Sequence, residues 1–260
     1  MCVLSGCGLS SNHYLLIDQS LAAHDVRRAD AIMAEAESEY GPRNRLLYSM
    51  DRGMTLHLAG EYVQSNAQLE SAAQEVERLY TRTIRTETAA FLTNDNVLPY
   101  EGDPYEHVMI NIIKALNYAA MGQLMEAVVE ARQIDHRLNV LSDTAKEKDG
   151  YREDAFARYL TGVLYEATGD LNNAFIAYRK AYDIYDATKT WARTPMPPML
   201  RADLLRTTDA LHMTTEFEEY KRLFPGTPWM PRAEHQNLAQ VVVIGYNGRA
   251  PRKEDAFLDI

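Results

Sequence analysis

Apolar residues recur at helical spacing on both sides of a short turn in residues 154–183 of this chain. The turn is centred on Gly169, a residue type that ends one helix before another begins. The pattern predicts two antiparallel helices joined by this turn, with small Gly162 and Ala174 where the backbones approach. The recurring positions are Ala155, Tyr159, Gly162, Leu164 and Tyr165 before the turn, and Leu171, Ala174, Tyr178 and Ala181 after it.

Three earlier segments repeat this pattern of paired helices, at residues 13–40, 45–80 and 107–141. Gly60 and Gly122 occupy the turns of the second and third, and His24 that of the first. The turns are 36, 62 and 47 residues apart in chain order, so residues 81–106 and 142–153 are predicted to be insertions. The order of small, aromatic, turn and alanine positions resembles the tetratricopeptide (TPR) repeat, whose period is about 34 residues. That resemblance implies an all-α fold, an α-solenoid of stacked hairpins.

The C-terminal part of the chain differs from the repeats. Prolines at residues 195–198 predict an extended linker, and two helices that cap the array are predicted near residues 200–211 and 217–224. Residues 240–244 are rich in β-branched residues, and Asn247-Gly248 is a strong turn signal, so a short β-hairpin is predicted. An alternative is that this stretch lies against the helices. The expected organisation is residues 1–12 as a signal remnant and linker, 13–190 as repeats, 191–235 as linker and capping helices, and 236–260 as a hairpin tail, with further chain expected beyond it.

Composition limits the functions to be considered. The chain has 260 residues, 46% of them hydrophobic, and a formal net charge of −10. A strongly acidic protein does not favour phosphate backbones, so we expect no nucleic-acid partner. The seven histidines show no metal-ligand spacing, and no nucleophile elbow, phosphate-binding loop or dinucleotide motif is present. The sequence therefore predicts no enzyme, no metal and no cofactor.

The two cysteines, Cys2 and Cys7, both lie near the N-terminus. The sequence LSGC at residues 4–7 resembles the bacterial lipobox, at which signal peptidase II cuts and the cysteine becomes the acylated first residue. By the sorting rule of that lipoprotein family, Gly8 rather than an aspartate after the cysteine favours the outer membrane. We therefore expect lipidation at Cys7, by palmitate and related chains, and a membrane anchor on the periplasmic side. Only six residues precede Cys7, so the leader is expected further upstream; the alternative is a chance match in a cytosolic protein.

The insertion at residues 81–106 is rich in turn-forming residues. Two roles are considered for it, contact with a partner and capping of the next helix. Tyr100, Glu101 and Asp103 are candidates to contact a partner from a structured loop. The alternative is structural, with Asp103-Pro104 capping the first helix of the third hairpin. The acidic residues near His107 are also compatible with a cation site or acid–base pair, but a capped helix start accounts for them more simply.

The first helix of each hairpin is expected to line a concave groove. Polar residues on these helices are predicted to be exposed there and to bind a peptide or protein. They are Asn111, Lys114, Asn117 and Arg158.

Several runs resemble an uncharacterised family of bacterial TPR-containing lipoproteins. They are LLYSMDRG at 46–53, TNDN at 93–96, PYEG at 99–102, ALNY at 115–118, DAFARY at 154–159 and YNGRAP at 246–251. The resemblance implies a cell-envelope setting and assigns no activity or catalytic residue. The leading hypothesis is an outer-membrane-anchored periplasmic scaffold that binds an envelope protein or peptide. The alternatives are a regulatory subunit of a cell-wall enzyme, and an enzyme whose active site lies in a further C-terminal segment.

Overall fold

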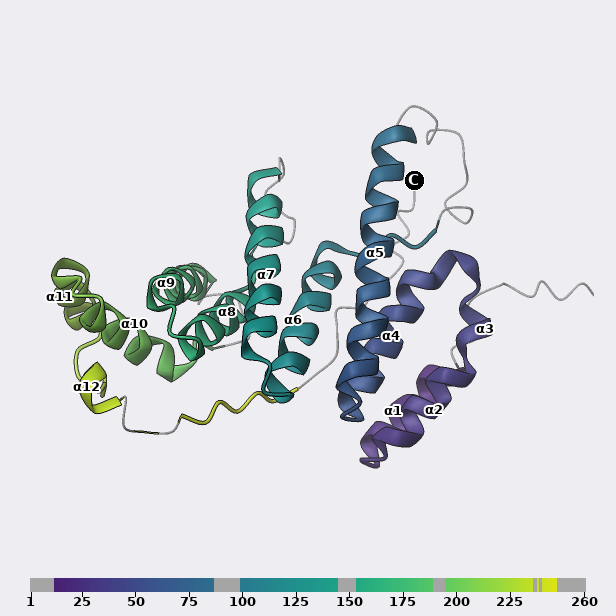
Figure 1. Ribbon diagram of the computed structural model, residues 1–260, viewed down its shortest axis with the longest axis horizontal. Coiled ribbons are helices and arrows are strands. Elements are labelled where there is room, and N and C mark those ends of the chain that lie inside the picture. Colours follow the sequence, from purple (N-terminus) through teal and green to yellow (C-terminus); the bar gives the residue numbers. More distant parts are fainter. Residues whose placement is uncertain are drawn as a thin grey trace, which may run out of the picture.

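The protein folds into helical hairpins that follow one another along the chain (Figure 1). The computed structural model describes residues 12–86, 99–144, 153–188, 195–235, 238 and 240–246. The first helices of the hairpins, here called A helices, are α1 (Asn12–Ala22), α4 (Arg45–Leu58), α6 (Pro104–Ala120), α8 (Ala155–Ala167) and α10 (Pro198–Ala210). Their partners, the B helices, are α2 (Val26–Glu35), α5 (Tyr62–Thr86), α7 (Leu124–Thr144), α9 (Leu171–Thr188) and α11 (Thr214–Leu223). Short helices α3 (Glu37–Tyr40), η1 (Pro42–Asn44) and α12 (Arg232–His235) complete the described elements.

Each A helix ends in the same hydrogen-bonded turn. After α4, the N–H of Gly60 donates to the carbonyl of His57 and the next N–H donates to the carbonyl of Leu56, at 3.0 and 2.9 Å. Equivalent pairs of bonds close the other four turns. The residue at the turn has positive φ in every case, 57° for His24 and His212 and 73–82° for the three glycines. This left-handed helix end explains why glycine is preferred there, and it confirms the predicted repeat register.

The two helices of a hairpin approach closely at the predicted small residues. A Cβ atom on Gly53 would lie 2.6 Å from Cδ2 of Leu69, and one on Gly162 would clash with the ring of Tyr178. Both neighbouring side chains are almost completely buried. Ala115, which occupies the matching place in α6, is also fully buried. The sequence pattern therefore predicted these crossing points correctly.

The hairpins stack in chain order. α2 contacts α4, α5 contacts α6, α7 contacts α8, and α9 contacts α10, so each B helix packs on the A helix of the next hairpin. α4 also contacts α6, which brings two A helices together on one side of the array. Figure 1 shows an elongated arrangement with α1 and α11 at opposite ends. The predicted pair of end helices is confirmed as α10 and α11, and these form a fifth hairpin with the same turn.

The predicted C-terminal β-hairpin is not found among the described residues. Residues 240–246 are extended but form no strand, and Asn247-Gly248 lies outside the part of the chain that the structure describes. Residues 240–246, here called the return segment, instead run back from α12 toward the earlier hairpins (Figure 1). Ile244 packs against the main hydrophobic core, so this side chain meets helices rather than a second strand.

None of the described helices combines the length and the apolar content needed to cross a bilayer. Cys7, the predicted lipidation site, lies outside the described residues, as does the run at 93–96.

Candidate functional site

The four polar residues that were predicted to line an open groove are buried. Asn111, Lys114, Asn117 and Arg158 are 3, 7, 0 and 0% exposed. The prediction of exposure is therefore wrong. Lys114, Asn117 and Arg158 bond to the preceding hairpin, and Asn111 bonds to the partner helix of its own hairpin. They are buried because an A helix is covered both by its own partner and by the preceding B helix. Burial is tolerated because these groups are hydrogen-bonded or ion-paired.

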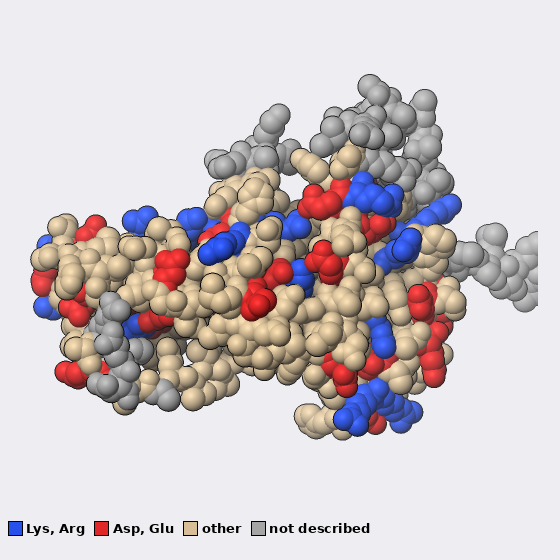
Figure 2. Space-filling view, in the orientation of Figure 1, with Lys and Arg blue, Asp and Glu red and all other residues tan. Residues whose placement is uncertain are grey.

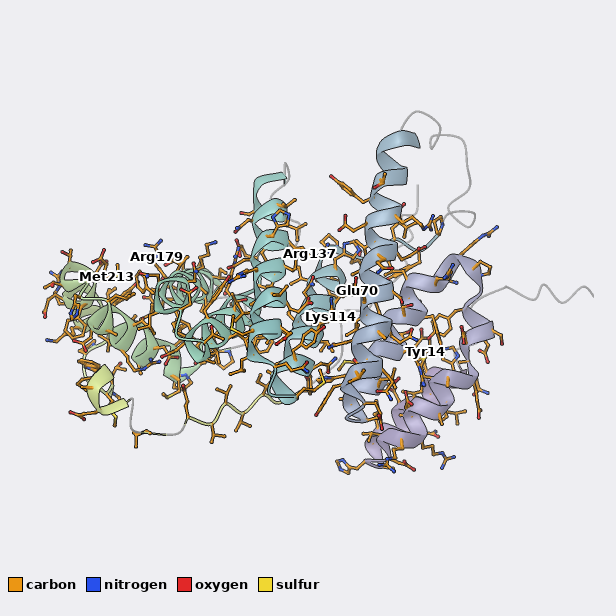
Figure 3. The ribbon with its side chains drawn as sticks, in the orientation of Figure 1. Tyr14, Glu70, Lys114, Arg137, Arg179 and Met213 are labelled. Atoms are coloured by element: carbon orange, nitrogen blue, oxygen red, sulfur yellow. The ribbon has the colours of Figure 1, made fainter. Side chains whose placement is uncertain are left out.

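Lys114 connects the second and third hairpins. Its Nζ lies 2.8 Å from Oε2 of Glu70 on α5 and 2.9 Å from Oε1 of Glu130 on α7. Figure 3 shows Lys114 and Glu70 pointing toward one another between the two hairpins. Burial lowers the pKa of Lys114, but the bonds to Glu130 and Glu70 outweigh it and the pKa is raised, so the ammonium stays charged. Asn111 extends this network by donating to Oε2 of Glu130 at 2.7 Å and accepting from Nε of Arg137 at 2.9 Å.

Arg158 connects the third and fourth hairpins. Its guanidinium bonds to Glu153 through Nε and Nη2, at 2.8 and 2.9 Å, and to Oδ1 of Asn139 at 3.0 Å. Nη1 pairs with Asp135 on α7. The planar fork of arginine suits this set of acceptors, which surrounds it on several sides. Arg158 therefore holds α8 against α7 rather than facing solvent.

The last junction contains a cluster that the sequence prediction missed. Arg206 on α10 donates from Nη2 to Oε2 of Glu166 at 2.8 Å and to Oδ1 of Asp203 at 2.7 Å. The phenols of Tyr159 and Tyr178 donate to the same two carboxylates, each at 2.8 Å. Burial raises the pKa of Asp203 to about 6, against the hydrogen bond from Tyr159. The fourth and fifth hairpins are thus joined by charged groups within an apolar core.

The first junction follows the same scheme with tyrosines. Tyr14 and Tyr40 both donate to Oδ2 of Asp51, at 2.8 and 2.7 Å. Burial raises the pKa of Asp51, while these two hydrogen bonds act against it. Arg52 pairs with Asp30 at 2.5 Å beside them. All four junctions between hairpins therefore carry polar networks.

The described part of the Tyr100 loop is bound to its own chain. Asp103 is the N-cap of α6, with Pro104 following it and Glu106 completing a capping box. Oε2 of Glu106 accepts from the backbone N–H of Asp103 at 2.7 Å and from the phenol of Tyr100 at 2.6 Å. The carbonyl of Glu101 accepts from Nε2 of His107 at 2.8 Å. The structural alternative for this loop is therefore confirmed, and partner contact by Tyr100, Glu101 and Asp103 stays a prediction.

Asn117 and His57 link the buried contact between α5 and α6 to a partly exposed ring on α4. Asn117 on α6 donates from Nδ2 to Ser65 and Asn66 on α5, at 2.9 and 2.8 Å. Its Oδ1 lies 2.6 Å from Nδ1 of His57 on α4. Because Oδ1 only accepts, His57 carries its proton on Nδ1 and presents an acceptor at Nε2. Burial lowers the pKa of His57, against its hydrogen bond to Asn117, and so favours this neutral form.

The return segment contacts this acceptor. The phenol of Tyr246 donates to Nε2 of His57 at 2.7 Å, and the two rings meet edge to face with centroids 5.5 Å apart. The partners are 189 residues apart in the chain. Sequence reasoning missed His57, which has no motif around it. The signal that was available is the run of β-branched residues at 241–244, which favours an extended backbone.

Charged side chains of both signs are interspersed over the face shown in Figure 2, so no area of a single sign dominates it. Among the described residues, no group of three or more histidine, cysteine, aspartate or glutamate side chains is arranged to hold a metal ion.

The fold is similar to solved TPR-like repeat proteins. The chain is similar to BtubC (BKLC) from P. vanneervenii, with a TM-score of 0.51 and 15% identity over 97% of this chain and 88% of that one. It is similar to a variant of the nearly identical TPR-like repeats of a Podosopora anserina putative kinesin light chain, with a TM-score of 0.51 and 16% identity over 88% of this chain and 97% of that one. No family model and no curated protein matches the sequence. The chain therefore has a TPR-like helical repeat fold.

Proposed function

We propose that this protein is a scaffold that binds an extended segment of another protein of the cell envelope. The observation that carries this proposal is the return segment itself. An extended stretch of chain is bound on the helical array through Ile244 and Tyr246, without backbone pairing to any described residue. A surface that binds one extended segment through side chains is suited to bind another.

The stacked fold supports this proposal. Each hairpin contacts its neighbours in order, and the first and last hairpins are at opposite ends (Figure 1). Such arrays are quasi-one-dimensional and present long surfaces to partners. The junction networks support these surfaces with charge-assisted bonds between successive hairpins. Three ion pairs tie a B helix to the next A helix, and the pair of Arg206 with Glu166 ties α10 to α8. Rigid surfaces lose less entropy on binding.

We further propose that acylation at Cys7 anchors the scaffold to the outer membrane, on its periplasmic side. The support for this is the lipobox-like LSGC at residues 4–7 and the resemblance to envelope lipoproteins. Metabolic labelling with radioactive palmitate tests it. We expect label on the native chain and none on Cys7→Ala. Equal labelling of the two would contradict the anchor.

Partner binding is tested by photo-crosslinking in envelope extracts. A photoreactive amino acid replaces Met109, which is 44% exposed on the A helix α6, and in a matched control replaces Ile176, which is 41% exposed on the B helix α9. We expect a discrete crosslinked protein from position 109 and not from position 176. The same set of products from both positions, or none from either, would contradict a scaffold that binds through its A helices.

A further inference from the structure

The return segment presents its two sides differently. Val241 and Val243 are 83 and 88% exposed, whereas Val242 is 48% exposed and Ile244 packs on the core. Tyr246 is 53% exposed, and its phenol lies on His57. Side chains two residues apart point to the same side of an extended chain, so residues 242, 244 and 246 form the side that faces the helices.

The contact at His57 is selective for a hydroxyl donor. Asn117 fixes the ring tautomer by accepting from Nδ1, and Asn117 is itself fully buried and held by Ser65 and Asn66. Nε2 of His57 is therefore an oriented acceptor for the phenol. A phenylalanine would retain the ring contact and lose the hydrogen bond.

We propose that the return segment is an internal ligand, and that it occupies the place where a partner's extended segment binds with a tyrosine on His57 and an aliphatic residue two positions earlier. This rests on the proposed scaffold function and adds the chemistry of the partner. A partner must displace the return segment, whose tether to the array gives it an effective concentration of about millimolar. The segment therefore selects against weak partners.

A peptide with the sequence QVVVIGY, residues 240–246, tests the proposal by fluorescence anisotropy against full-length protein. The double variant Ile244→Ser/Tyr246→Ser releases the segment, and Val241→Ser/Val243→Ser, on the solvent side, is the matched control. We expect the peptide to bind the released variant about ten-fold or more tightly than the native and control proteins. A peptide ending in phenylalanine is expected to bind several-fold more weakly, because it cannot donate to His57. Equal affinity for native and released protein, or binding to neither, would overturn the proposal.

A second measurement needs no released variant. In full-length Tyr246→Phe, the ring ¹⁵N signals of His57 are expected to shift, and those of exposed His136 are expected to stay unchanged. Unchanged His57 signals would also overturn the proposal. The two functional claims have separate outcomes. Protein that binds the peptide but crosslinks no envelope protein contradicts the scaffold function, whereas equal peptide affinities contradict only the internal ligand.

Discussion

Replacing Arg158 with methionine tests whether the junction networks hold the array together. The Arg158 side chain is fully buried and bonds to Glu153, Asp135 and Asn139. Removing one partner of a fully buried ion pair costs about 3–5 kcal/mol. The carboxylate side chains of Asp135 and Glu153 are 26 and 29% exposed, so water can solvate them partly after the change. We therefore expect a loss of about 2–3 kcal/mol, with methionine retaining most of the apolar packing.

Urea unfolding followed by circular dichroism measures this loss. The matched control is Arg78→Met on α5, since Arg78 also pairs with a glutamate but its side chain is 55% exposed. We expect no measurable change in the midpoint for that variant, because exposed pairs are screened by water. Hydrogen exchange shows where in the array the stability is lost. In Arg158→Met, amide exchange should become faster in α7 and α8 but not in α1 and α2. An Arg158→Met protein as stable as the native one, or a loss matched by Arg78→Met, would show that the buried ion pairs do not hold α8 against α7.

Three further predictions concern the turns, the helix crossings and pH. His24→Gly is expected to raise the free energy of unfolding by up to about 1 kcal/mol in urea titrations, since His24 has a φ of 57° that glycine adopts without strain; a decrease would contradict the strain. Gly162→Ala is expected to lower the thermal midpoint, because the added Cβ clashes with the buried ring of Tyr178 and overpacking costs about 1–3 kcal/mol; the same change should cost less in a Tyr178→Leu background, and an equal cost in both backgrounds would refute the clash. Burial lowers the pKa of His57, so below about pH 6.5 the unfolded chain takes up a proton that the folded chain resists, and stability falls as pH falls. Urea titrations between pH 7 and pH 5 should show this fall reduced in His57→Gln, and identical slopes would exclude His57 as its source.

The repeat architecture could be predicted from the sequence because its determinants are local. Gly60, Gly122 and Gly169 mark the turns, and the small residues seven positions earlier mark the helix crossings. His24 was identified as the turn residue of the first hairpin from its register alone, and its positive φ confirms this. The predicted β-hairpin is not found among the described residues, for a different reason. A run of β-branched residues favours an extended backbone, and it does not distinguish pairing with a neighbouring strand from packing on a helical surface.

The exposure of the four polar residues could not be judged from residue type. Polar residues are mostly exposed in proteins, and that expectation failed at Asn111 and Arg158 because the A helices are covered on two sides. The repeat register does not settle it either. Asn111 and Arg158 each lie eleven residues before the turn residue of their hairpin, and so does His13, which is 4% exposed. The fifth hairpin has Arg201 at this position, and that side chain is exposed, so the position alone does not mark burial.

The contact between Tyr246 and His57 lies beyond any such comparison, and it is the feature on which the partner chemistry depends. It joins residues 189 positions apart, and no other hairpin repeats the pair, so the repeat register cannot reveal it. Its selectivity also arises indirectly, since Asn117 sets the tautomer of His57 from inside the core while the phenol binds the nitrogen that is left to accept. Asn117 was predicted to bind a partner directly. In the structure it is fully buried, and it acts on whatever binds at His57 only by deciding which ring nitrogen is free to accept.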